Sequence, residues 1–144
     1  MTGIDASKLM PVCLLLLALA GTSALPDGAP SYACKSPVNM VPAHSHAAPL
    51  SAKDSDYKLI QDKAAFKAND VVTVQLLTKG LPFKGFLVKA VDEHGKDVGQ
   101  FLPGDLYHKV EECPAATHVD RSDKTLVTMR WQAPADHSGQ VHFV

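Results

Sequence analysis

Long hydrophobic runs, aromatic side chains and an excess of charge of one sign are all scarce in this chain of 144 residues. Aromatic residues make up 6% of the sequence, and Trp131 is the only tryptophan, which leaves few side chains on which the bases of a single-stranded nucleic acid would stack. Fourteen lysines and arginines face fifteen aspartates and glutamates, so a formal net charge of -1 provides no broad positive field. We therefore expect no nucleic-acid partner.

Motifs that frame an activated nucleophile or hold a phosphate are also absent. The sequence contains no G-x-S-x-G, no H-E-x-x-H and no glycine-rich phosphate loop. Glu111 and Glu112 are adjacent carboxylates, but neighbouring residues of a strand point to opposite faces, so we interpret them as solvated charge beside Cys113. We predict that the protein is not an enzyme and needs no cofactor.

The composition that remains is that of one globular domain. Hydrophobic residues make up 46% and charged residues 20% of the chain, which argues against wholesale disorder and against collagen-like or coiled-coil architectures. A length of 144 residues has room for a single domain. We expect that domain to span residues 25–144.

The longest apolar run, Leu9–Gly21, is about 13 residues long and too short for a bilayer, which needs ~20 helical residues. Lys8 precedes the run and small residues follow it, an order typical of a secretory signal peptide. We predict that residues 1–24 are a signal peptide cleaved after Ala24, that the protein is secreted and extracellular, and that it has no membrane span. A cut after Ala20 is the alternative. A buried N-terminal helix would normally carry polar residues every third or fourth position, and this run has none.

Cleavage would remove Cys13 and leave Cys34 and Cys113, an even pair in an oxidising compartment, where a disulfide is the expected state. Closing a loop of about 80 residues would stabilise the fold by roughly 4 kcal/mol in the chain-entropy model. The alternative is a pair of free thiols with a catalytic or metal-binding role. The lack of a C-x-x-C spacing disfavours it.

Short apolar segments of strand length follow a proline-rich stretch. From Leu25 to about Leu50 the prolines recur too often for a helix or a central strand, which predicts an extended segment tied to the domain by Cys34. Beyond it, turn residues separate the apolar segments. The expected strands are Val71–Leu77, Phe86–Val91, Val98–Leu102, Thr125–Trp131 and Gln140–Val144.

The pattern within these segments predicts their partners and faces. A turn at Glu93–Lys96 joins the second and third strands into a hairpin. Asp62–Phe66 forms one helical turn at most, and no helix of ten residues is expected. In the last two strands alternation turns one set of side chains to the core and His142 outward; the inward set is Val127, Met129, Trp131, Val141 and Phe143. The chain is therefore predicted to be an antiparallel β-sandwich.

Histidines suggest a metal site that the sequence does not complete. His44 and His46 have the spacing at which two imidazoles point to the same side of an extended strand. Zinc or copper would need further ligands, and the candidates are scattered without a motif: Asp54, Asp56, His108 and His118. We interpret the histidines as surface residues and predict no metal.

Four lysines in the middle third of the chain suggest a surface for phosphate- or sulfate-bearing polymers. They are Lys79, Lys84, Lys89 and Lys96. Asp92, Glu93 and Asp97 are interspersed among them, which favours a mixed, solvated face.

Several residue strings resemble those of a known family. Pro26–Pro30 (PDGAP) leads to Cys34, and Pro82–Ala90 (PFKGFLVKA) is the most distinctive string. The others are Met40-x-Pro42-x-His44, Gly99-x-Phe101, Cys113, Thr117-His118 and Trp131-x-Ala133-Pro134. In this order they resemble the reeler (reelin-type) domain, over nearly all of the chain from Pro26 to Val144.

The resemblance implies an all-β, immunoglobulin-like antiparallel sandwich in which Cys34 and Cys113 are bridged. Gly85 then allows a bulge or a close backbone approach where Phe83 and Phe86 enter the core, and Trp131 packs on the disulfide. The family continues into another aromatic-containing strand, so we expect the last strand to be missing after Val144. The strings are fold residues and leave the ligand-binding residues unknown.

Reeler proteins of this size that consist of one domain are similar to the secreted insect defence proteins, and this chain resembles them. The resemblance thus implies a non-enzymatic innate-immunity protein with antimicrobial action through binding microbial surface polymers: lipopolysaccharide, lipoteichoic acid or glucan. A pore-forming mode is not expected, because the chain lacks a cationic amphipathic helix. The alternatives are an extracellular adhesion or matrix module that binds proteoglycan or protein partners, and the N-terminal fragment of a larger protein such as a ferric-chelate reductase.

Overall fold

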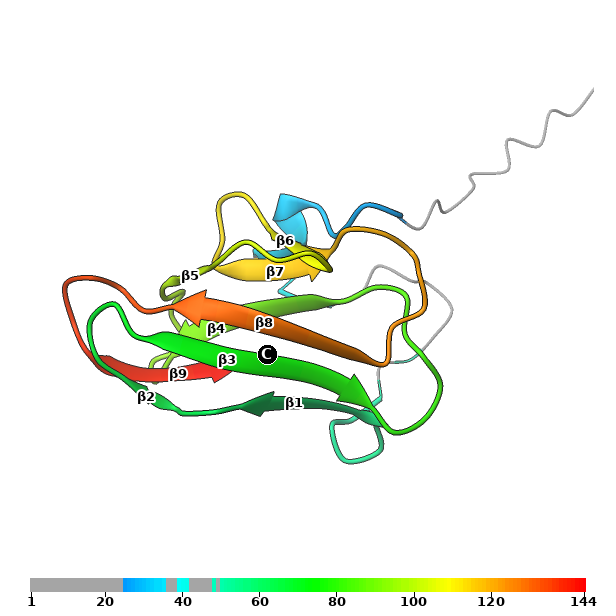
Figure 1. Cartoon of the computed structure of the whole chain (residues 1–144), viewed down its shortest axis with the longest axis horizontal. Coiled ribbons are helices and arrows are strands. Elements are labelled where there is room, and N and C mark those ends of the chain that lie inside the picture. The colour runs from blue at the N-terminus through cyan, green and yellow to red at the C-terminus, as the bar shows by residue number, and fades with distance from the viewer. Residues whose placement is uncertain (1–24, 36–38, 42–47, 49) are drawn as a thin grey trace, which may run out of the picture.

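A computed structural model describes residues 25–35, 39–41, 48 and 50–144. One short 3-10 helix and nine strands follow one another along these residues (Figure 1). They are η1 (Ser31–Cys34), β1 (Tyr57–Gln61), β2 (Ala65–Phe66), β3 (Val71–Thr78), β4 (Leu87–Asp92), β5 (Gln100–Phe101), β6 (Tyr107–Lys109), β7 (Ala115–His118), β8 (Leu126–Gln132) and β9 (Gly139–Phe143). The predicted signal peptide, His44 and His46 lie outside the described residues.

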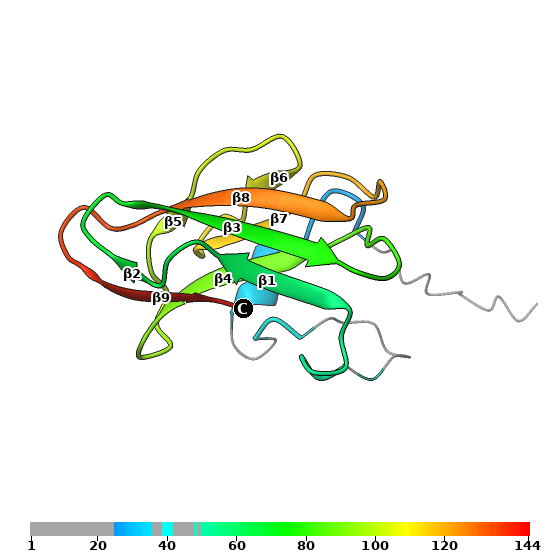
Figure 2. The same cartoon turned by 60° about the horizontal axis from the view of Figure 1, so that its bottom comes forward.

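The strands form two antiparallel sheets that pack face to face (Figure 2). Sheet A has the order β1-β3-β8-β5, and sheet B has the order β2-β9-β4-β7-β6. The predicted all-β sandwich is confirmed. Within the described residues no helix is long and apolar enough to cross a membrane.

The core lies between the sheets and is built by alternation along the strands. On β8, Val127, Met129 and Trp131 are fully buried while the residues between them are exposed. The predicted faces of β9 are also confirmed, since Val141 is buried, Phe143 packs against the core and His142 is exposed. This period of two is what a strand with one dry face requires.

Trp131 is at the centre of an aromatic group in this core. Its ring packs edge-on against Phe66 and Phe143, with centroids 5.3 and 5.9 Å away. Its indole N–H donates to the Val98 carbonyl oxygen at 3.0 Å, so the buried polar atom has a partner. The disulfide belongs to a separate cluster with Val110 and Ala115. The prediction that Trp131 packs on the disulfide is therefore wrong.

The predicted hairpin is half right. The turn at Glu93–Lys96 forms, because the Asp92 carboxylate accepts the backbone N–H groups of His94 and Lys96, each at 2.8 Å. The next strand, however, is only the two residues of β5 and pairs with β8 in sheet A, whereas β4 belongs to sheet B. The chain crosses from one sheet to the other at Gly99. Its φ of +64° is readily adopted by glycine, which has no Cβ, and is unfavourable for other residues.

Four strands were not anticipated. β6 and β7 are short, and β7 begins with two alanines, which have low β-propensity. β1 is an edge strand with four of its five residues exposed, so it shows no alternation. In place of the single helical turn expected at Asp62–Phe66, the chain makes β2 and pairs Ala65 and Phe66 with β9.

The glycine at the sheet crossover gives a test of this packing. A Cβ at Gly99 would lie 2.2 Å from the Trp131 ring, whereas one at Gly95 (φ +73°) would meet open space. We predict that Gly95→Ala costs about 1 kcal/mol of unfolding free energy, from the backbone conformation alone. Gly99→Ala should cost about 2–3 kcal/mol more, because its methyl group must displace the indole ring. Urea unfolding measures both, and equal losses would contradict the packing.

Candidate binding surface

The N-terminal strap, residues 25–35, lies against the outer face of sheet B at β4, β6 and β7. Cys34, at the end of η1, is bonded to Cys113 in the loop between β6 and β7, with Cα atoms 6.7 Å apart. The predicted disulfide is confirmed, but it fastens the strap to one sheet instead of joining the two. Around it Cys34, Val110 and Ala115 form a small buried cluster, with Leu87 and Met40 packed against it.

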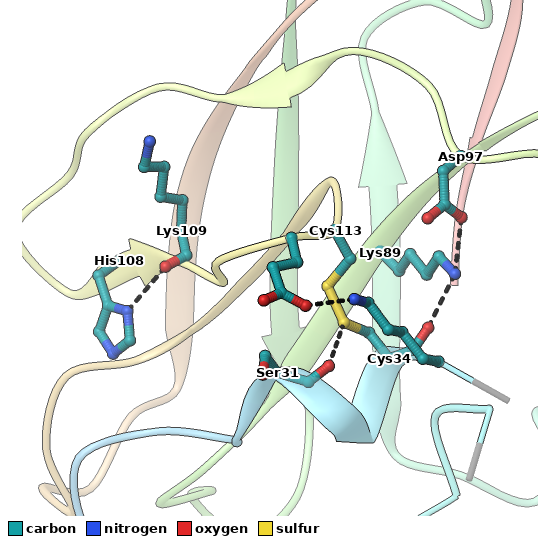
Figure 3. The surroundings of a disulfide bond; sticks show 9 residues. Ser31, Cys34, Lys89, Asp97, His108, Lys109 and Cys113 are labelled. Carbon is teal, nitrogen blue, oxygen red and sulfur yellow. Dashed lines mark hydrogen bonds and ion pairs between the residues drawn. A yellow bond between two sulfur atoms is a disulfide. The ribbon is translucent and has the colours of Figure 1, made fainter. Parts of the chain in front are cut away.

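Lys89 secures the same place from β4 (Figure 3). Its ammonium group donates to the Cys34 carbonyl oxygen at 2.9 Å and pairs with the Asp97 carboxylate at 2.7 Å. Only 16% of its side chain is exposed, so this pair is screened less than one on the surface. Lys89 therefore holds the strap and is not available to a polymer outside.

Thr117 joins the strap to the start of β4. Its fully buried hydroxyl group accepts the Ala29 N–H at 2.8 Å and donates to the Phe86 carbonyl oxygen at 2.7 Å. One side chain thus provides a hydrogen-bond partner for the Ala29 N–H and for the Phe86 carbonyl oxygen, and buried backbone groups need such partners. Gly28 beside it has φ +118°, and a Cβ there would meet the Thr117 methyl group at 2.7 Å.

His118 completes the junction. Its Nδ1 accepts the Phe86 N–H at 3.0 Å, and its Nε2 lies 3.3 Å from the Leu25 carbonyl oxygen. A Cβ at Gly85 would lie 2.8 Å from the imidazole ring, which confirms the predicted close approach. Phe83 is buried and Phe86 packs against the core, as predicted. Three of the strings that carry the family resemblance, Pro26–Pro30, Pro82–Ala90 and Thr117-His118, therefore meet in space at the strap.

His108 holds the strap from β6. Its Nε2 lies 2.8 Å from the Asp27 carbonyl oxygen and its Nδ1 lies 3.0 Å from the Lys109 carbonyl oxygen. Both neighbours are acceptors, so only the doubly protonated imidazolium can donate to both. These two carbonyl groups raise the pKa of His108 above its ordinary value of 6.5.

The candidate metal ligands do not come together. His108 and His118 face backbone groups of the strap, while Asp54 accepts the Ser51 hydroxyl at 2.5 Å in the segment before β1. The Asp56 carbonyl oxygen accepts the Lys79 N–H at the end of β3. Among the residues that the structure describes, no group of three metal-ligating side chains occurs.

The four lysines do not form a patch either. Lys79 and Lys84 lie in the loop before β4, and Lys96 lies in the turn after it, at the opposite end of that strand. Lys84 pairs with Asp123 at 2.8 Å. With Lys89 turned to the strap, no continuous basic face results.

Glu111 and Glu112 are both exposed beside Cys113, as predicted. Glu112 pairs with Lys35 of the strap, and hydrogen bonding to that ammonium group lowers the pKa of the carboxylate. This pair lies across the disulfide and adds an exposed contact, of the kind that contributes little to stability.

One charged group with a structural role gave no signal in the sequence. The Lys124 side chain is 2% exposed, and its ammonium group donates to carbonyl oxygens of Lys84, Asp120 and Ser122 at 2.9–3.1 Å. It also pairs with the Asp120 carboxylate at 2.9 Å. Hydrogen bonds from Ser122 and then from Lys124 lower the pKa of Asp120. The lysine thus acts as an internal cation for the β7–β8 loop, because a buried charge needs such partners.

Sheet A presents its outer face to solvent (Figure 1). Its register places Leu77 of β3 between Lys58 of β1 and Leu126 of β8, with Ile60 two residues further along β1. Ile60 is 50% and Leu126 48% exposed. Among the described residues this face combines exposed apolar side chains with basic ones, which makes it the candidate binding surface.

The histidine that holds the strap predicts a pH dependence. Because the pKa of His108 is raised on folding, its contribution to stability is complete below the unfolded value of 6.5 and is lost as pH rises through the raised pKa. We predict that the unfolding free energy of wild type is larger than that of His108→Gln at acid pH, and that this difference becomes smaller above about pH 7. Urea unfolding at several pH values measures it. His142→Gln, on the exposed face of β9, serves as the control, and a difference that is independent of pH would contradict the assignment.

Comparison with known proteins agrees with these observations. The family model of the reeler domain matches residues 33–144. The chain is 34% identical to "Putative defense protein 3" of Antheraea mylitta, over 92% of this chain and 82% of that protein. It is 30% identical to human ferric-chelate reductase 1 over 92% of its own length, but it spans only 22% of that protein.

A solved structure supports the fold. The Reelin-N domain of F-spondin superposes with a TM-score of 0.52 at 22% identity, covering 62% of this chain and 69% of that one. The family match, the defence-protein similarity along most of both chains and the two-sheet fold agree with one another. The chain belongs to the reeler domain family.

Proposed function

We propose that this chain is a secreted, non-enzymatic defence protein that acts by binding molecules of microbial surfaces. The observation that carries the proposal is the similarity to the Antheraea mylitta protein, which extends over 82% of that protein's length. A relative matched along most of its length supports a shared role better than one matched along 22% of its length, as the human reductase is.

The roles of the polar groups support the non-enzymatic part of the proposal. His108, His118, Thr117 and Lys124 are engaged with backbone groups. General acid–base or nucleophilic catalysis needs such groups aimed at a substrate, and here they are aimed at the fold itself. Lipopolysaccharide, lipoteichoic acid and glucan are the proposed ligands.

The matrix-module alternative is less well supported. Retention by a sulfated proteoglycan needs a run of accessible cations, whereas Lys89 is turned inward and Lys84 is paired with Asp123. The other alternative, a reeler unit within a larger reductase, predicts that the domain alone binds no microbe.

A sedimentation assay tests the proposal. The protein secreted from the full coding sequence is incubated with Gram-positive bacteria, Gram-negative bacteria and yeast, and binding is competed with each purified polymer. We expect saturable binding to at least one cell type and no dye leakage from protein-free liposomes, since recognition requires no pore. A heparin column at rising salt is the control for simple polyanion binding. Absence of binding to every cell type would contradict the proposal.

A further inference from the structure

The candidate binding surface contains a groove at one side of sheet A. Its volume is about 540 Å³, and it lies between β8 and the loop that connects β5 to β6. Leu106 and Leu126, 43% and 48% exposed, are its largest open apolar side chains. Pro103, Gly104 and the buried Tyr107 contribute to the same lining.

The polar groups of the groove are few and include one cation. Arg130 lines it from β8, with Thr128 between Arg130 and Leu126 on the same face of the strand. Asp105 is the one carboxylate of the lining. Arg130 is exposed, and within the described part of the chain no carboxylate lies within 4.0 Å of its guanidinium group, so this cation has no ion-pair partner there.

The apolar character continues beyond the groove across the sheet. Leu126 is the direct cross-strand partner of Leu77, and Leu77 is the partner of Lys58. The leucines therefore form a strip that has Lys58 at one end and Arg130 on its flank. On sheet B, by contrast, the strap covers Leu87 of β4 and Ala115 of β7.

A strip of leucines beside an unpaired guanidinium group fits one class of ligand better than others. Acyl chains are stabilised by contact with apolar side chains, and phosphate is bound by arginine through charge-assisted hydrogen bonds. An uncharged glycan offers neither an acyl chain nor a negative charge, and the one aromatic residue of the lining, Tyr107, is buried and gives no open platform for a sugar ring. We infer that the groove between Leu106, Leu126 and Arg130 binds an anionic amphiphile, with the acyl chain on the leucines and the phosphate group at Arg130.

This inference rests on the proposed function and narrows it. Of the three proposed ligands, lipopolysaccharide and lipoteichoic acid carry both acyl chains and phosphate groups, and glucan carries neither. The site would therefore recognise the lipid end of a microbial amphiphile and not its polysaccharide.

Dodecyl phosphate below its critical micelle concentration is a suitable probe. Titration into the secreted protein, followed by amide NMR, should shift β8 and residues 103–107. Leu126→Ser should weaken binding about tenfold and Arg130→Gln about fivefold, since each removes one part of the recognition. Dodecyl maltoside, with the same chain and no charge, should bind equally to wild type and Arg130→Gln. Inorganic phosphate alone should cause no shift.

Two variants control for the loss of any leucine or any cation. Leu50→Ser removes a leucine that is 72% exposed in the segment before β1, and Lys96→Gln removes an exposed cation in the β4–β5 turn. Both should bind dodecyl phosphate as wild type does. All side chains changed are exposed, and far-UV circular dichroism verifies that each variant folds.

The outcomes separate this inference from the proposed function. Unchanged affinity in Leu126→Ser and Arg130→Gln, or shifts confined to sheet B, would overturn the inference. So would a concentration-dependent dimer that Leu126→Ser dissociates, because the strip would then face a second copy of the chain. If Leu126→Ser still sediments with microbes as wild type does, the groove is not the site that binds them, and the proposed function stands. If the probe binds the groove while wild type binds no microbe, the proposed function fails.

Discussion

The disulfide between Cys34 and Cys113 determines which surfaces of this sandwich are available. It lies outside the main core, on the outer face of sheet B, where the Lys89 ammonium group donates a hydrogen bond to the Cys34 carbonyl oxygen. The bond closes a loop with a sequence separation of 79, and the chain-entropy model assigns such a loop roughly 4 kcal/mol. With the strap fixed there, the β4–β7–β6 part of sheet B is covered by the molecule's own backbone, whereas sheet A keeps exposed leucines.

Three of the strings that identify the family build this arrangement. The backbone N–H and C=O groups of Phe86, in the most distinctive string, are bound by His118 and Thr117 of another. The string in the strap, Pro26–Pro30, contacts Thr117 and His118 through Gly28 and Ala29. Family membership can thus be recognised from residues that build the junction, while ligand recognition is left to side chains outside these strings, such as those on the open face of sheet A.

Sequence reasoning predicted the elements whose side chains alternate over a dry core. β3, β4, β8 and β9 were expected within one or two residues of their bounds, because hydrophobic periodicity marks them. The short β6 and β7 and the exposed edge strand β1 carry no such signal. The partner of β5 and the place of the disulfide depend on long-range packing around Gly99 and the strap, which no local pattern contains. For the same reason the pairing of Lys89 and Lys124 with backbone carbonyl groups could not be anticipated.

The central claim is that the Cys34–Cys113 disulfide holds the strap on sheet B without contributing to the main core. Hydrogen exchange of the folded protein before and after mild reduction tests this claim most directly. Reduction should release residues 25–35 and the β6–β7 region to fast exchange, while β3 and β8 stay protected and Trp131 fluorescence is unchanged, because Trp131 belongs to the other cluster. Loss of protection in β3 and β8 together with the strap, or a strap that stays protected without the bond, would contradict this account.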